Sequence, residues 1–131
     1  MLQNLPALVT LLNVLLQFFT LYLVGNARKR YDVKAPAISG HEGFERAWRV
    51  QMNTLEGTVM FLPVLWLATM YGFPGLAGIA GLVWLAGRLW YITTYLKDPA
   101  SRGPAFMISL AAWAALVVLA GFGIVRAMFL I

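Results

Sequence analysis

The chain alternates between long apolar runs and short polar connections, and this pattern predicts a bundle of helices. A helix needs about 20 apolar residues to cross the hydrocarbon layer of a membrane. Four segments approach this length, although only the later part of the second segment is fully apolar. The sequence therefore predicts four membrane helices, at Leu5–Ala27, Glu45–Tyr71, Pro74–Leu96 and Pro104–Phe129.

The composition supports a membrane location for these helices. Of the 131 residues, 61% are hydrophobic and only 11% are charged, whereas about a quarter of the residues in soluble domains are charged. We therefore expect an all-α membrane protein, a four-transmembrane-helix bundle forming a single domain over residues 1–131. The chain has no cysteine, which excludes disulfides and thiolate metal ligands. Because no second histidine or close carboxylate pair accompanies the single histidine, we expect no metal site.

The connections between the predicted helices differ in length and charge. The second connection, "YGFPG", is short and uncharged, whereas loops 28–44 and 97–103 hold most of the Lys and Arg side chains. The positive-inside rule places such loops on the cytoplasmic side, and both termini then face the opposite side. Arg126 is the one cation that does not fit this orientation. The net charge of +5 is explained by topology and anionic head groups, so we expect no nucleic-acid partner.

Polar side chains recur on one face of the second predicted helix, at the edge of its apolar part. Arg49, Asn53, Glu56 and Met60 are spaced i, i+4, i+7 and i+11, which places them on one helical face. Ionisable side chains at membrane depth usually face a bundle interior or an aqueous cavity. Two interpretations remain open: a structural Arg–Glu pair that fixes the helix register, or a cavity for a polar ligand.

The third predicted helix offers a second polar face. Arg88, Tyr91 and Tyr95 fall at i, i+3 and i+7. The tyrosines alone are also typical of aromatic residues at a membrane boundary. Arg88 lies inside the apolar run and needs an anion, either Glu56 or a bound ligand. Because arginines outnumber acids here, the pattern favours a small zwitterionic guest with a net negative charge, whose amine Glu56 would bind.

Two segments resemble a known family. "FERAWRVQMNTLE" and "GRLWYITTYLKDPASRGP" are similar to the signature of the MAPEG family, the membrane-associated proteins in eicosanoid and glutathione metabolism. The resemblance extends over nearly the whole chain. It implies a homotrimer that binds glutathione between neighbouring subunits. Gly57 and Gly103 depart from the leukotriene synthase and prostaglandin E synthase branches, which have Tyr and Ser there, so the resemblance identifies the family and not the acceptor.

The family pattern assigns roles to individual positions. It implies that Arg102 is the catalytic residue that stabilises the glutathione thiolate, because a nearby cation raises the thiolate fraction of a thiol. The implied glutathione-binding residues are Arg28, Arg49, Gln51, Asn53, Glu56, Arg88, Tyr91 and Tyr95.

The expected function is that of a membrane-embedded glutathione-dependent transferase or peroxidase. Glutathione would act as a co-substrate, and its thiolate would attack a lipophilic electrophile within the bilayer. A first alternative is a small-molecule membrane transporter, although the many arginines do not suit the export of lipophilic cations. A second alternative is a non-catalytic membrane protein that keeps the glutathione-binding scaffold, since Arg102 alone argues directly for chemistry.

Overall fold

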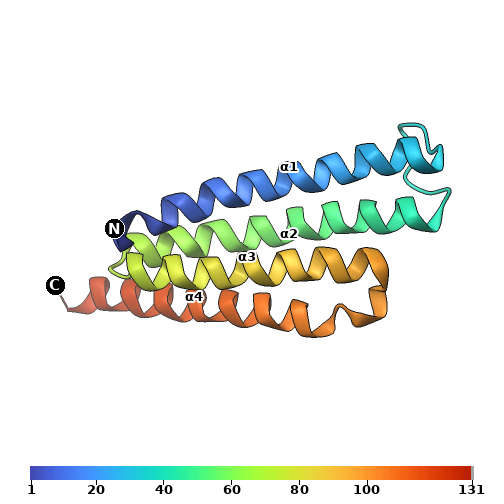
Figure 1. Ribbon diagram of the computed structural model, residues 1–131. Helices are drawn as coiled ribbons and strands as arrows, with labels where there is room; N and C mark the ends of the chain where they lie inside the picture. The colour runs from blue at the N-terminus through green and yellow to red at the C-terminus, as the bar shows by residue number, and fades with distance from the viewer. Residues whose placement is uncertain (131) are drawn as a thin grey trace.

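The computed structural model describes residues 1–130, and within this range the chain forms four long helices arranged side by side (Figure 1). Each helix runs antiparallel to the next along the chain, and both described ends lie at the same end of the bundle. The predicted all-α architecture is confirmed. The elements are η1 (Leu2–Asn4), α1 (Leu5–Tyr31), α2 (Glu42–Met70), α3 (Pro74–Lys97), η2 (Pro99–Ser101) and α4 (Gly103–Phe129).

The first connection is shorter than predicted. Loop 28–44 was expected, but α1 continues to Tyr31 and α2 begins at Glu42, which leaves residues 32–41 as the connection. Lys and Arg are good helix formers and are favoured in the last turn by the helix dipole, so the basic run extends α1. Asp32, with a left-handed φ of 53°, then ends the helix. His41 caps α2, because its Nδ1 accepts the Gly43 N–H at 2.9 Å.

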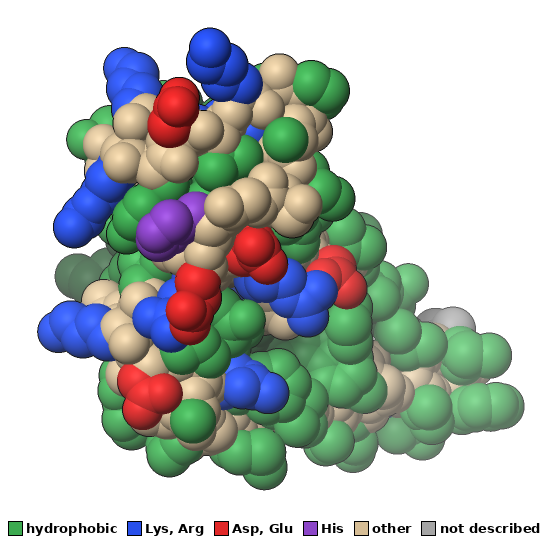
Figure 2. Space-filling model, turned by 90° about the vertical axis from the view of Figure 1, so that its right-hand side faces the viewer, with side chains coloured by type: hydrophobic (Ala, Val, Ile, Leu, Met, Phe, Trp, Pro, Cys, Tyr) green, Lys and Arg blue, Asp and Glu red, His purple; other side chains and the backbone are tan. Residues whose placement is uncertain are grey.

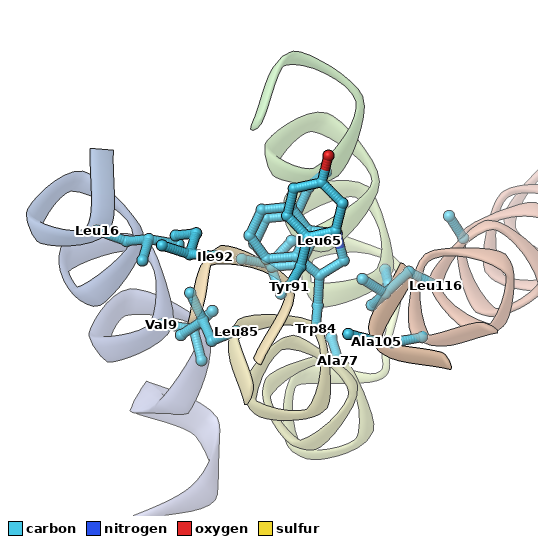
Figure 3. Close-up of a cluster of buried hydrophobic side chains, with 14 of the residues drawn as sticks. Val9, Leu16, Leu65, Ala77, Trp84, Leu85, Tyr91, Ile92, Ala105 and Leu116 are labelled. Carbon is cyan, nitrogen blue, oxygen red and sulfur yellow. The ribbon is translucent and has the colours of Figure 1, made fainter. Parts of the chain in front are cut away.

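The helices pack around α2 and α3, which both contact α1 on one side and α4 on the other. The core consists of side chains from all four helices, including Leu65, Trp84 and Leu116 (Figure 3). Glycines bring α3 close to α1. A Cβ at Gly78 would lie 2.6 Å from Leu5, so the absence of a side chain here permits the close packing of the two helices.

Three of the four helices in residues 1–130 are long and apolar enough to cross a membrane. These segments are Leu2–Tyr31, Pro74–Lys97 and Gly103–Phe129. The prediction of four spans is therefore supported for α1, α3 and α4 only. Helix α2 falls short because the charged side chains of its first half lower its hydropathy.

Charged side chains gather at one end of the bundle, where the α1–α2 and α3–α4 connections lie (Figure 2). Basic and acidic groups are mixed on this face, with His41 among them. At the other end, α4 carries Arg126 in its last turn. This asymmetry places the polar half of α2 beside the charged end of the molecule.

Candidate functional site

A polar pocket of about 240 Å³ lies between α2, α3 and the turn that precedes α4. It brings together six of the predicted site residues. Its lining residues are Arg49, Met52, Asn53, Glu56, Tyr91, Tyr95 and Arg102. The helical spacing seen in the sequence explains the grouping, because each helix presents one face to the pocket.

Helix α2 supplies one basic and one acidic side chain that do not bind each other. Arg49 and Glu56 are both exposed, and the single ion pair within residues 1–130 joins Arg46 and Glu42 instead. A register-fixing pair between Arg49 and Glu56 is therefore absent from this part of the chain. Both charges remain available to a ligand in the pocket.

Helix α3 supplies two stacked aromatic rings. Tyr91 and Tyr95 have ring centroids 5.5 Å apart and planes inclined by 20°. Tyr91 is buried and Tyr95 is half-buried. The guanidinium carbon of Arg88 lies 4.4 Å from the Tyr91 ring centroid, a favourable cation–π distance. The tyrosines therefore form a wall of the pocket, held from behind by Arg88.

Arg88 binds neutral partners, not the anion that we expected. Its side chain is 3% exposed, and it donates from Nη1 to Asn53 Oδ1 at 2.9 Å and from Nη2 to Thr54 Oγ1 at 2.8 Å. The suggested pairing with Glu56 is therefore wrong for residues 1–130. Arg88 does not line the polar pocket and instead orients Asn53 and Tyr91, which do. Sequence reasoning did not identify Thr54 as a partner of Arg88. The adjacent short hydrogen-bonding side chains of Asn53 and Thr54 were the feature that could have indicated it.

Arg102 lies on a short turn that its own neighbours hold in place. The Asp98 carboxylate accepts the Ala100 N–H at 3.2 Å, and the Ser101 hydroxyl donates to the Asp98 carbonyl at 2.8 Å. Arg102 donates from Nη1 to the Pro99 carbonyl at 2.8 Å. A guanidinium has five N–H donors, so this exposed side chain keeps donors that can bind a ligand.

An apolar pocket of about 220 Å³ adjoins the polar one and shares Asn53 and Glu56 with it. A third pocket, of about 430 Å³, includes Asn53, Tyr91 and Arg102 and so also borders the polar pocket. Together they form a groove that is polar at one end and apolar at the other. The remaining lining residues of the apolar pocket are Gly57, Met60, Trp84, Arg88, Phe106, Ser109, Leu110 and Trp113.

The walls of the apolar pocket are rigid aromatic side chains. Trp84 stacks on Phe61 with ring centroids 4.0 Å apart and planes inclined by 3°. Trp113 donates from Nε1 to the Met60 carbonyl at 3.0 Å. A Cβ at Gly57 would lie 3.3 Å from Trp84 Cζ2, so the glycine leaves the edge of this indole open. Sequence reasoning missed these walls, because tryptophans in an apolar helix have the same pattern in a core, a lipid-facing surface or a pocket.

Besides Arg88, two more predicted ligand-binding residues do not line the polar pocket. Arg28 donates from Nη1 to the carbonyls of Val33 and Ala37, at 3.3 and 2.8 Å. Gln51 lies seven residues before Thr58, the partner of Asn13 of α1, and therefore on the face of α2 that turns toward α1. Its buried Oε1 has no hydrogen-bond partner within the described range.

The arrangement suits a small ligand that carries both charges and is joined to an apolar group. Guanidinium groups bind carboxylates and thiolates, and Glu56 binds an amine. Within residues 1–130, no three His, Asp or Glu side chains are grouped so that they could hold a metal ion.

Comparison with known proteins gives consistent matches along most of the chain. Residues 6–122 match the MAPEG family. An uncharacterized protein of Synechocystis sp. is 42% identical over 113 residues, which cover 86% of this chain and 82% of that protein. Leukotriene C4 synthase of Bos taurus is 38% identical over 119 residues, 90% of this chain and 79% of the relative. Microsomal glutathione S-transferase 2 of Homo sapiens is 35% identical over 118 residues, 90% and 80% respectively.

Proposed function

The chain belongs to the MAPEG family, and on this premise we propose that it is a membrane-embedded transferase that joins glutathione to a lipophilic electrophile. The name of one relative, microsomal glutathione S-transferase 2, supports glutathione as the co-substrate. One observation carries the proposal: a single groove joins a polar pocket, in which Arg49 and Glu56 make no ion pair within residues 1–130, to an apolar pocket walled by tryptophans.

Glutathione fits the polar pocket by its chemistry. It carries two carboxylates, one amine, two peptide groups and one thiol. Arg49 is placed to bind a carboxylate, Glu56 to bind the amine, and Asn53 to hydrogen-bond a peptide group. The tyrosine pair closes the wall, and Arg88 holds Asn53 and Tyr91 in position without entering the pocket.

The reaction requires a thiolate, and Arg102 is the group placed to stabilise it. A free thiol has a pKa of about 8.5, and each unit of change corresponds to about 1.4 kcal/mol. A hydrogen bond to a charged group contributes about 1.5–3 kcal/mol. One guanidinium contact made only with the thiolate therefore lowers the thiol pKa by about one to two units, which brings it close to neutral pH. The proton of the thiol leaves to solvent at the exposed end of the groove.

The electrophile occupies the apolar pocket beside the thiolate. The sulfur forms a bond to an electrophilic carbon, and the electron pair of the bond that breaks leaves with a halide or remains on the oxygen of an opened epoxide. Asn53 and Glu56 line both the polar and the apolar pocket, so the two reactants meet beside these residues. The aromatic walls exclude water from the acceptor and limit its size.

We propose that the protein assembles as a homotrimer whose subunits complete each other's sites. Arg28 and Gln51 lie outside the polar pocket of their own chain, and the buried Gln51 Oε1 has no partner within residues 1–130. Because neither residue enters the polar pocket of its own chain, we assign both to the site of an adjacent subunit. In this assembly α2 also crosses the membrane, because it packs between α1 and α3, and the charged end faces the cytoplasm.

The test combines ligand binding with turnover in detergent-purified protein. We expect wild-type protein to bind glutathione, to show ultraviolet thiolate absorbance near neutral pH and to conjugate a generic aryl halide. Arg102→Ala should still bind glutathione but should lose the thiolate signal and most of kcat. Lys97→Ala removes a nearby exposed cation that does not line the pocket and serves as the matched control.

Three results would contradict parts of the proposal. Unchanged glutathione affinity in Arg49→Ala and Glu56→Gln would exclude the polar pocket as the binding site. Thiolate formation in Arg102→Ala equal to that of wild type would exclude Arg102 as the activating residue. Glutathione binding without any thiolate or turnover in wild type would favour the non-catalytic scaffold.

A further inference from the structure

A second crevice lies at the end of the bundle opposite the glutathione groove. It measures about 430 Å³ and is formed where the α2–α3 turn meets the last turns of α4. Arg126 is its one charged lining residue among the described residues. The others are Met70, Tyr71, Gly72, Gly123, Ala127 and Leu130.

The Arg126 guanidinium is held in this crevice by aromatic rings. Its central carbon lies 5.5 Å from the Phe73 ring centroid and 5.9 Å from that of Phe122. Both distances are within the range of cation–π attraction. The two rings also contact each other, with centroids 6.0 Å apart. The cation is therefore positioned by the fold before any ligand arrives.

Two glycines make room for this arrangement. Gly72 has a φ of +113°, and a Cβ there would lie 2.6 Å from Arg126 Nη2. A Cβ at Gly123 would lie 2.5 Å from the Tyr71 carbonyl oxygen, so this glycine lets the turn approach α4. The Gly72 N–H makes no hydrogen bond within residues 1–130. Both residues line the crevice, so an amide without a protein partner in this range lies close to the guanidinium.

The position of Arg126 along α4 corresponds to the level of the lipid head groups. It lies 23 residues after Gly103, or about 35 Å along the axis at about 1.5 Å per residue. The hydrocarbon layer is about 30 Å thick. With Gly103 at one surface, Arg126 reaches the other surface, where the phosphates of phospholipids lie.

The protein offers Arg126 no anion of its own within the described range. No ion pair includes it, and the nearest acid on α2, Glu56, lies fifteen residues before Tyr71. That separation is about 22 Å along the helix. The Arg126 side chain is exposed, so its guanidinium is open to an anion from outside residues 1–130.

We propose that this crevice binds a phosphate group, with the Arg126 guanidinium and the Gly72 N–H as its donors. A guanidinium binds two phosphate oxygens at once, and the apolar walls of Met70, Ala127 and Leu130 suit the glycerol and acyl parts of a phospholipid. The proposal is independent of the glutathione chemistry, because none of its residues lines the other groove.

Native mass spectrometry of the delipidated protein tests this site. The probes are phosphatidylglycerol, diacylglycerol with the same acyl chains, and inorganic phosphate, each added separately. We expect wild type to retain phosphatidylglycerol but not diacylglycerol. Arg126→Gln should lower phosphatidylglycerol affinity about tenfold, the change expected for one lost charge-assisted contact. Lys29→Gln removes the same charge at the other end of the bundle and should lower the affinity much less.

Gly72→Ala provides a second variant that keeps every charge. Its Cβ displaces the guanidinium, so phosphatidylglycerol affinity should also fall, and circular dichroism of both variants verifies that the helices remain. Binding of inorganic phosphate that depends on Arg126 would support a phosphate site filled from solution. Equal retention of the two lipids by wild type would overturn the proposal, and so would equal losses of phosphatidylglycerol affinity in Arg126→Gln and Lys29→Gln. Both results can be obtained even if Gly72→Ala does not fold.

Discussion

At the scale of single residues, the site depends on a buried arginine that never enters the polar pocket. Arg88 spans the gap between α3 and α2 and binds Asn53 and Thr54. Periodicity predicted that Arg88 lies on the same face as Tyr91, and burial predicted that it needs a partner. Periodicity gives a helical face but not the residue opposite on the next helix, so the sequence favoured an anion where the structure has an amide and a hydroxyl.

Removing the Arg88 side chain should destabilise the fold as well as the site. Arg88→Met leaves Asn53 Oδ1 and Thr54 Oγ1 without their donor, and each stranded group costs about 1–3 kcal/mol. We expect the free energy of unfolding in detergent to fall by about 2–5 kcal/mol. Thr54→Val should cost stability in wild type but almost nothing in Arg88→Met, a double-mutant cycle that isolates this contact. Additive losses would show that the two side chains act separately.

Gly57 lines the apolar pocket beside Trp84, a contact that the sequence alone did not reveal. In Gly57→Phe, the Cβ contacts Trp84 and the ring fills the space where an electrophile would bind. Misfit of a single methylene in such a pocket costs about 10–200-fold in kcat/KM, so we expect a loss of at least about tenfold for a bulky aryl halide. Glutathione affinity, measured by calorimetry, should change little.

Met60→Leu is the matched control, because it lies in the same pocket and nearly conserves side-chain volume. It should leave kcat/KM close to that of wild type. If Gly57→Phe conjugates the bulky acceptor as fast as wild type, the electrophile does not bind beside Trp84.

At the scale of elements, the helix boundaries followed from strong local signals. Pro74 and Pro104 lie in the first turns of α3 and α4, and Gly72 lies in the turn after α2. These residues start or stop helices through their backbone geometry alone, so the sequence locates them well. The end of α1 was misplaced because a basic run is compatible with both a loop and a helix C-terminus, and only the left-handed Asp32 decides between them.

Replacing glycine by alanine should change stability in opposite directions at two sites, one inside the α1–α3 contact and one outside it. In Gly78→Ala, the new Cβ lies 2.6 Å from Leu5 and overpacks the contact, which should cost about 1–3 kcal/mol of unfolding free energy. Gly25→Ala adds the same methyl where nothing lies within 4 Å, and helix propensity should then stabilise α1 by up to about 1 kcal/mol. Thermal unfolding in detergent measures both. Stabilisation by Gly78→Ala would contradict the close packing of these helices.

At the scale of the whole molecule, the charged side chains gather at one end of the bundle, and one pocket there brings together six of the nine predicted site residues. The topology was predictable, because four hydrophobic runs with short connections must alternate direction. The completeness of the site was not predictable from one chain. Arg28 and Gln51 match the family pattern for glutathione binding but lie away from the pocket of their own chain, and sequence spacing does not distinguish a subunit's own site from its neighbour's.

Mixing inactive subunits tests whether neighbours share each site. In the proposed trimer, one subunit supplies Arg49 and the next supplies Gln51, so both Arg49→Ala and Gln51→Ala homotrimers should lose most glutathione turnover. In a cyclic trimer each subunit contacts its two neighbours through different surfaces. A site is therefore intact only where a Gln51→Ala subunit provides Arg49 and an Arg49→Ala subunit provides Gln51. Random mixing in equal amounts restores about a quarter of the sites.

The recovery must depend on subunit exchange. Coexpression of the two variants should restore about a quarter of wild-type turnover. In a mixed trimer, both substituted residues can lie at one interface, and another interface then has both native residues. Mixing the separately purified trimers without exchange should restore none. If Arg49 and Gln51 serve the site of the same subunit, every subunit carries a defect in its own site, and no combination of these variants recovers activity. That result would mean that the buried Gln51 amide makes contacts between helices of one subunit and not between subunits.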